Sequence, residues 1–224
     1  MTKSSPLSSL VNRPPNGNIE LTLTIPWGEI QKAYESAVLE AVTETELPGF
    51  RKGKAPRKLV EAKLDKTHTL NHALQHLLPK AYTHAADKHT LKPILYPQIK
   101  IVSGKEGEDW VFLATTCEAP KIKLGPLNKD LEQLVKTSQV HMADLLIEEE
   151  ANHRLASLAE NITRLGMTID TYLKTKKLTA ESLKSQLAQD ARRDLTIEFI
   201  LQEVQRTQKL EDRPQTLDYL QKLV

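Results

Sequence analysis

Aromatic residues and cysteine are scarce in this chain of 224 residues. Aromatic side chains make up 4% of it, and three methionines add little soft apolar surface, which disfavours a broad methionine-rich binding face. The single cysteine, Cys117, has no partner for an internal disulfide. This is typical of a protein from a reducing compartment, and it excludes a disulfide-stapled scaffold.

Long apolar runs and an excess of one charge are also missing. No stretch approaches the roughly 20 apolar residues of a membrane span, and residues 1–10 lack the apolar run of a signal peptide. The 31 basic and 29 acidic residues leave a net charge of +2, which argues against a general nucleic-acid coat. We therefore expect a cytoplasmic protein that binds neither membrane nor DNA, with any electrostatic role carried by local clusters.

Signatures of catalysis are missing as well. The chain has eight glycines, and none forms a glycine-rich phosphate loop. No serine lies in a nucleophile-elbow context, and Cys117 is expected to be a small, partly buried residue on a strand because the sequence gives it no positioned base. We predict no catalytic residue, no enzyme activity and no cofactor.

The first half of the chain alternates between strand and helix patterns. Residues 18–26 alternate apolar and polar side chains with period two, as in a half-buried strand. Helical spacing follows, then a loop, two further helices and a hairpin. The expected elements are an edge strand 7–11, a strand 18–26, a helix to residue 46, helices 57–64 and 67–89, and strands 94–102 and 110–118.

The second half is expected to be wholly helical from about Ser138. A polar connection at 121–137, with Gly125-Pro126, precedes it. Gly166 is suited to end the first helix, a short helix covers 169–174, and Thr179 is a suitable N-cap for a last helix that ends near Leu210. The predicted fold is an α+β amino-terminal domain, with an antiparallel sheet and a helix-loop-helix tip, at 1–125. A linker at 126–137 and an all-α domain at 138–224 follow.

The stretch around which the chain is organised is the tip loop at 48–57, Pro-Gly-Phe-Arg-Lys-Gly-Lys-Ala-Pro-Arg. Its glycines permit backbone angles that other residues resist, and Pro56 suits the first turn of the next helix. One aromatic side chain stands among cations, which packing alone explains poorly, whereas loops on rigid flanks often contact partners. The alternative to a partner-binding loop is an ordinary basic turn that contacts only solvent. The candidate site residues are Gly49, Phe50, Arg51, Lys52, Gly53, Lys54, Pro56 and Arg57.

The same loop resembles the signature of the bacterial trigger factor family, G-F-R-x-G-K-x-P, at every fixed position. The similarity extends over residues 7–125 and includes Leu91-Lys92-Pro93. Looser similarity to the family's helical carboxy-terminal domain lies at Leu165-Gly166-Met167, at Tyr172-Leu173 and at 178–187. Members of the family normally carry an FK506-binding-type prolyl isomerase domain between these regions. The gap between residues 118 and 138 is too short for such a domain of roughly 90 residues.

This resemblance implies a ribosome-associated chaperone that needs no ATP. In the family, the residues that match Phe50, Arg51 and Lys52 dock on a protein of the large ribosomal subunit beside the exit tunnel, close to ribosomal RNA. The implied partners are therefore the large subunit and nascent or unfolded polypeptides. The helices expected at 138–224 each carry a stripe of apolar side chains at helical spacing. These stripes either pack against one another or partly face clients. Two alternatives remain: an RNA-binding ribosome accessory protein, and a prolyl isomerase by family label.

Three histidines, His68, His72 and His76, are spaced four apart and share one helix face. An i, i+4 histidine pair is one half of a metal site. No glutamate follows the first histidine and the sequence offers no obvious further ligand, so we predict no metal site here.

Overall fold

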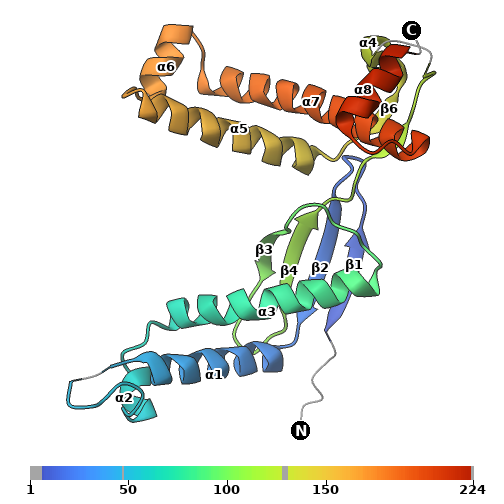
Figure 1. Cartoon of the computed structure of the whole chain (residues 1–224). Coiled ribbons are helices and arrows are strands. Elements are labelled where there is room, and N and C mark those ends of the chain that lie inside the picture. Colours follow the sequence, from blue (N-terminus) through green and yellow to red (C-terminus); the bar gives the residue numbers. More distant parts are fainter. Residues whose placement is uncertain (1–6, 47, 128–130, 223–224) are drawn as a thin grey trace. The chain divides into compact units, whose positions relative to one another are not determined.

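Alternating apolar residues build a four-stranded antiparallel sheet in the first half of the chain (Figure 1). The structure, a computed structural model, describes residues 7–46, 48–127 and 131–222. The sheet has the strand order β1-β2-β4-β3. Its strands are β1 (Ser8–Asn12), β2 (Ile19–Ile25), β3 (Gln98–Ser103) and β4 (Trp110–Thr116).

One face of this sheet carries the core of the first unit. Burial alternates along β2 and β4, and the register pairs Leu23 with Phe112. Phe112 and Leu23 are fully buried, and side chains of a long helix, among them Tyr82 and Ala85, complete the cluster. Because side chains of a strand point alternately to the two faces, the period-two pattern of the sequence selects this face.

Three helices project the tip loop from this core. They are α1 (Trp27–Glu44), α2 (Arg57–Glu61) and α3 (Lys66–Lys88), and α1 packs along α3. The small residues Ala37 and Ala73 are buried between them. Asp65 caps α3 because its carboxylate accepts hydrogen bonds from the backbone N–H groups of Thr67 and His68.

The second unit is built mainly on two long helices. These are α5 (Asp144–Arg164) and α7 (Ala180–Gln208), which pack on each other and are joined through α6 (Ile169–Lys176). Thr179 is the N-cap of α7, as expected, and forms a reciprocal capping box with Ser182. Residues of a distant segment cap α5, since the Asn18 side chain accepts from the Leu145 N–H at 3.0 Å.

The remaining elements of this unit pack near the end of α7. They are β5 (Lys121–Lys123), α4 (Leu131–Thr137), β6 (Gln139–His141) and α8 (Arg213–Lys222). Leu134 on α4 and Leu220 on α8 are buried with Ile200 and Val204 of α7. β5 pairs with β6 in an antiparallel ladder.

The predicted fold class is confirmed: an antiparallel sheet with long helices is followed by a mostly helical region. One detail was wrong, because β6 interrupts the stretch that was expected to be wholly helical. A short helix, α4, also lies in the stretch 126–137. The helix α8 was not predicted. Among the described residues, no helix is long and apolar enough to cross a bilayer.

The chain forms two compact units that are not continuous in sequence. The first comprises residues 1–13, 19–92 and 96–116, and the second comprises 14–18, 93–95 and 117–224. The domain bounds 1–125, 126–137 and 138–224 stay predictions. Parts of these ranges, namely 1–6, 47, 128–130 and 223–224, lie outside the described residues.

Candidate functional site

The tip loop connects α1 to α2 and is shaped by its two glycines. Gly49 and Gly53 have φ angles of +85° and +72°, in the region that favours glycine. The Gly53 N–H donates to the Thr45 carbonyl at 3.4 Å, and the Lys54 N–H donates to the Arg51 carbonyl at 2.9 Å. A Cβ added at Gly53 would lie 3.0 Å from the Thr43 carbonyl oxygen. The loop therefore returns close to the end of α1, and its backbone course depends on glycine at 53.

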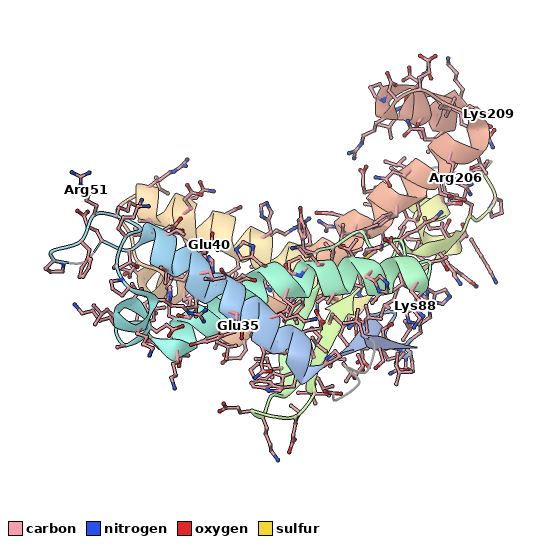
Figure 2. All side chains as sticks on the ribbon, turned by 90° about the horizontal axis from the view of Figure 1, so that it is seen from below. Glu35, Glu40, Arg51, Lys88, Arg206 and Lys209 are labelled. Carbon is pink, nitrogen blue, oxygen red and sulfur yellow. The ribbon has the colours of Figure 1, made fainter. Side chains whose placement is uncertain are left out.

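The loop presents an aromatic side chain together with unpaired cations. Phe50 is 39% exposed, and Arg51, Lys52 and Lys54 are exposed too. Across the part of the chain that the structure describes, no carboxylate pairs with these three cations. Arg51 points away from the loop (Figure 2). A phenyl ring among free cations is suited to an external surface that is partly apolar and partly anionic.

Arg57 differs from the other cations predicted for the site. Its Nε lies 2.5 Å from the Glu61 carboxylate, one helical turn further along α2. This hydrogen bond raises the pKa of Arg57 above its ordinary value. Arg57 is therefore already engaged within the chain and offers less to a partner than Arg51 does.

Sequence reasoning missed an exposed apolar residue beside the loop. Leu59 on α2 is 48% exposed, whereas its neighbour Val60 is fully buried. The signal was available: in so short a helix only one side faces the core, so of two adjacent apolar residues one faces solvent. Leu59 adds apolar area to the same end of the first unit as Phe50.

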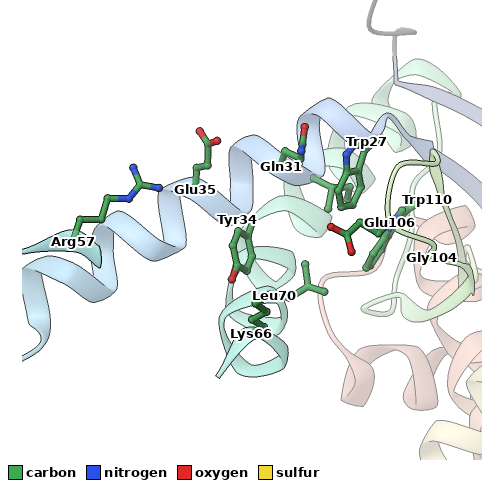
Figure 3. A pocket seen from close by; sticks show the side chains of 11 residues that line it. Trp27, Gln31, Tyr34, Glu35, Arg57, Lys66, Leu70, Gly104, Glu106 and Trp110 are labelled. Carbon is green, nitrogen blue, oxygen red and sulfur yellow. The ribbon is translucent and has the colours of Figure 1, made fainter. Parts of the chain in front are cut away.

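A hollow of about 540 Å³ lies in the first unit between α1, α3 and the β3–β4 hairpin (Figure 3). Trp27 and Trp110 stack at its wall with ring centroids 6.4 Å apart, and Tyr34 and Leu70 add apolar surface. Its size is in the range of pockets that hold small ligands or apolar side chains. No sequence pattern indicates this hollow, because its walls come from segments that are far apart in the sequence.

The second unit exposes a small apolar cluster where α5 turns into α6. Leu165 is 73% exposed, and Met167 and Ile169 are partly exposed. Gly166 between them has a φ angle of +73° and ends the helix, as expected. Apolar residues of both helices pack in one core cluster, among them Leu146 of α5 and Ala191 of α7. That the exposed residues face clients stays a prediction.

The environment of Cys117 decides whether its thiol is reactive. Cys117 is completely buried directly after β4, and burial raises the pKa of its thiol to about 11. It is therefore poorly suited to act as a nucleophile.

His72 and His76 lie with ring centroids 4.9 Å apart on α3, and Glu40 of α1 joins them. The structure thus supplies the further ligand that the sequence did not reveal.

Comparison with known proteins points to one family. The family described as bacterial trigger factor protein matches residues 8–154, and the one described as bacterial trigger factor protein C-terminus matches residues 127–219. The matched ranges overlap, so no residues lie between them. Trigger factors of Staphylococcus aureus strains JH9 and Newman are each 33% identical over 144 residues, which are 64% of this chain.

The matched part spans about a third (33%) of the length of these curated relatives. A solved structure of a trigger factor chaperone, concerned with promiscuous substrate recognition in folding and assembly, is 20% identical. It covers 68% of this chain and 35% of its own chain, with a TM-score of 0.39.

Proposed function

Because the chain belongs to the bacterial trigger factor family, we propose that it is a ribosome-associated chaperone. It docks on the large subunit near the exit tunnel through residues 49–57 and shields nascent or unfolded polypeptides without ATP. Its working place is then the cytoplasm. Within the loop, Phe50 supplies apolar contact area, and Arg51 and Lys52 supply the charge.

The observation that carries this proposal is the state of three neighbouring side chains. Phe50, Arg51 and Lys52 are exposed on a loop that is positioned by α1, α2 and Gly53. An exposed arginine binds a carboxylate or phosphate with two parallel hydrogen bonds. Such a contact is small and salt-sensitive, which suits a chaperone that must leave the ribosome again.

Co-sedimentation with 70S ribosomes tests the docking role. The triple variant Phe50→Ala, Arg51→Ala, Lys52→Ala should lose at least tenfold in ribosome affinity, because one aromatic anchor and two charges are removed. Its circular dichroism should be unchanged, since all three side chains are exposed. If the triple variant pelleted with ribosomes as the wild type does, the site assignment would be wrong.

A matched control uses the same unit of the chain. The triple variant Leu10→Ala, Lys100→Ala, Lys105→Ala also removes one exposed apolar side chain and two exposed cations. It should bind ribosomes like the wild type. Equal loss in both variants would mean that overall charge, and not the loop, drives binding.

The RNA-binding alternative rests on the exposed cations Arg51, Lys52 and Lys54. It predicts binding to isolated ribosomal RNA with a steep dependence on salt. Docking on a ribosomal protein predicts little binding to that RNA at physiological salt. The near-neutral net charge of +2 favours the protein-docking proposal.

We also infer that prolyl isomerase activity is absent. The two family matches overlap, which leaves no intervening segment for an isomerase domain. A proline-peptide assay should show no rate above background, and measurable turnover would contradict this inference.

A further inference from the structure

Two histidines and a glutamate from different helices come together in the first unit. His72 and His76 are one turn apart on α3, and Glu40 lies on α1, where Figure 2 labels it. One donor atom from each of the three lies within 4.8 Å of the other two. Glu40 and His76 are exposed and His72 is half-buried, so ions in solution can reach all three.

The spacing of these groups suits an ion better than a direct contact. The Nδ1 atom of His72 lies 3.9 Å from a carboxylate oxygen of Glu40, too far for a hydrogen bond. Two ligand atoms of a tetrahedral zinc ion, with bonds of about 2.0 Å, are roughly 3.3 Å apart. Small side-chain rotations therefore bring the three donors to zinc-binding distances.

We propose that Glu40, His72 and His76 bind a zinc ion. Two imidazole nitrogens and one carboxylate oxygen form a donor set that zinc accepts in proteins, with water in the fourth position. The histidine pair alone binds metal weakly at i, i+4 spacing; Glu40 adds a third donor with a negative charge. Glu44 and His68 lie beside the site and add to the local donor density.

The helices hold these ligands without large movement. Ala37 and Ala73 are buried in the seam between α1 and α3, so the two helices approach closely next to the three donors. Asp65 caps the start of α3, about two helical turns before His72. A bound ion would cross-link α1 to α3 and should raise the thermal stability of the unit.

The test is a titration of tag-free, chelator-treated full-length protein with zinc, followed by calorimetry and by competition with a chromophoric chelator. We expect one zinc ion per chain. Each of Glu40→Gln, His72→Ala and His76→Ala should weaken affinity at least tenfold. His84→Ala is the control, because His84 is an exposed histidine on the same helix outside the cluster; it should bind like the wild type.

Cobalt gives a second readout, because a cobalt ion with a low coordination number has visible absorption bands. These bands should disappear in the three ligand variants. Zinc should also raise the melting temperature of the wild type and of His84→Ala only. The proposal is overturned if the wild type binds no zinc. It is also overturned if Glu40→Gln binds as tightly as the wild type, because the histidine pair would then act without a third ligand.

Discussion

At the residue scale, the course of the tip loop depends on Gly53. Its φ angle of +72° is unfavourable for any side chain, and a Cβ would press on the Thr43 carbonyl at 3.0 Å. Gly107 has a similar φ of +86° but nothing within 4 Å of a new Cβ. Comparing substitutions at Gly53 and Gly107 therefore separates the cost of backbone strain from the cost of a steric clash.

We predict that Gly53→Ala lowers the unfolding free energy by about 2 kcal/mol, against about 1 kcal/mol for Gly107→Ala. Urea denaturation of both variants measures the difference. Ribosome affinity should fall severalfold in Gly53→Ala and stay unchanged in Gly107→Ala. Equal costs in stability would show that the loop moves away from Thr43 without strain.

Cys117 gives a prediction for alkaline pH. Its pKa is raised to about 11 in the folded protein, above the ordinary value, because burial disfavours the thiolate. The stabilisation is therefore complete below the pKa of the unfolded chain, about 8.5, and is lost as the pH rises toward 11. Between pH 8.5 and 11 the wild type should lose on the order of 2 kcal/mol more than Cys117→Ala in denaturant unfolding. Parallel curves would contradict a fully buried thiol.

At the element scale, one charged side chain bridges the two long helices of the second unit. Arg154 on α5 donates to Glu150 at 2.7 Å and to Asp194 on α7 at 2.9 Å, and it is largely shielded from solvent. The hydrogen bond from Arg154 holds the pKa of Asp194 below its ordinary value. Arg164, by contrast, forms an exposed pair with Glu160 within α5.

Arg154→Met should therefore cost about 1 kcal/mol at pH 7, whereas Arg164→Met should cost less than about 0.5 kcal/mol. The pKa of Asp194 is lowered in the folded protein. Asp194 therefore contributes to the free energy of unfolding above the pKa of the unfolded chain, about 3.9, and this contribution is lost as the pH falls below that value. The cost of Arg154→Met should shrink accordingly between pH 5 and pH 3. Thermal unfolding across this range provides the measurement, and a cost independent of pH would exclude the bridge to Asp194.

Local patterns in the sequence predicted most elements within a few residues of their observed ends. The alternation at 18–26 and the capping signal of Thr179 are examples, because each depends on neighbours in sequence. The short strand β6 was missed since its partner β5 lies 16 or more residues earlier. For the same reason the sequence revealed His72 and His76 but not Glu40, which only the packing of α1 on α3 brings near.

At the scale of the whole molecule, the chain combines a unit that carries the tip loop with a unit built on long helices. Each unit exposes apolar surface of its own: the hollow beside Trp27 and Trp110 in the first, and Leu165, Met167 and Ile169 in the second. Both surfaces are small, so the client binding that we propose should be weak and broad in specificity.

The hollow predicts a signal for client binding. The chain has two tryptophans, and both line this hollow. An unfolded apolar peptide that enters it should shift or quench their fluorescence, whereas a peptide of equal length with polar replacements should not. Suppression of client aggregation without any change in this fluorescence would place the client elsewhere, with the cluster around Leu165 as the next candidate.

The proposed function requires the tip loop to contact a protein of the large ribosomal subunit. The most direct test places a photo-crosslinking phenylalanine derivative at position 50, in the full chain, and irradiates it with purified ribosomes. We predict one main cross-link to a large-subunit protein, which disappears when Arg51 and Lys52 are also replaced by alanine. Cross-links to ribosomal RNA alone, or none from position 50 while the protein still pellets with ribosomes, would contradict it.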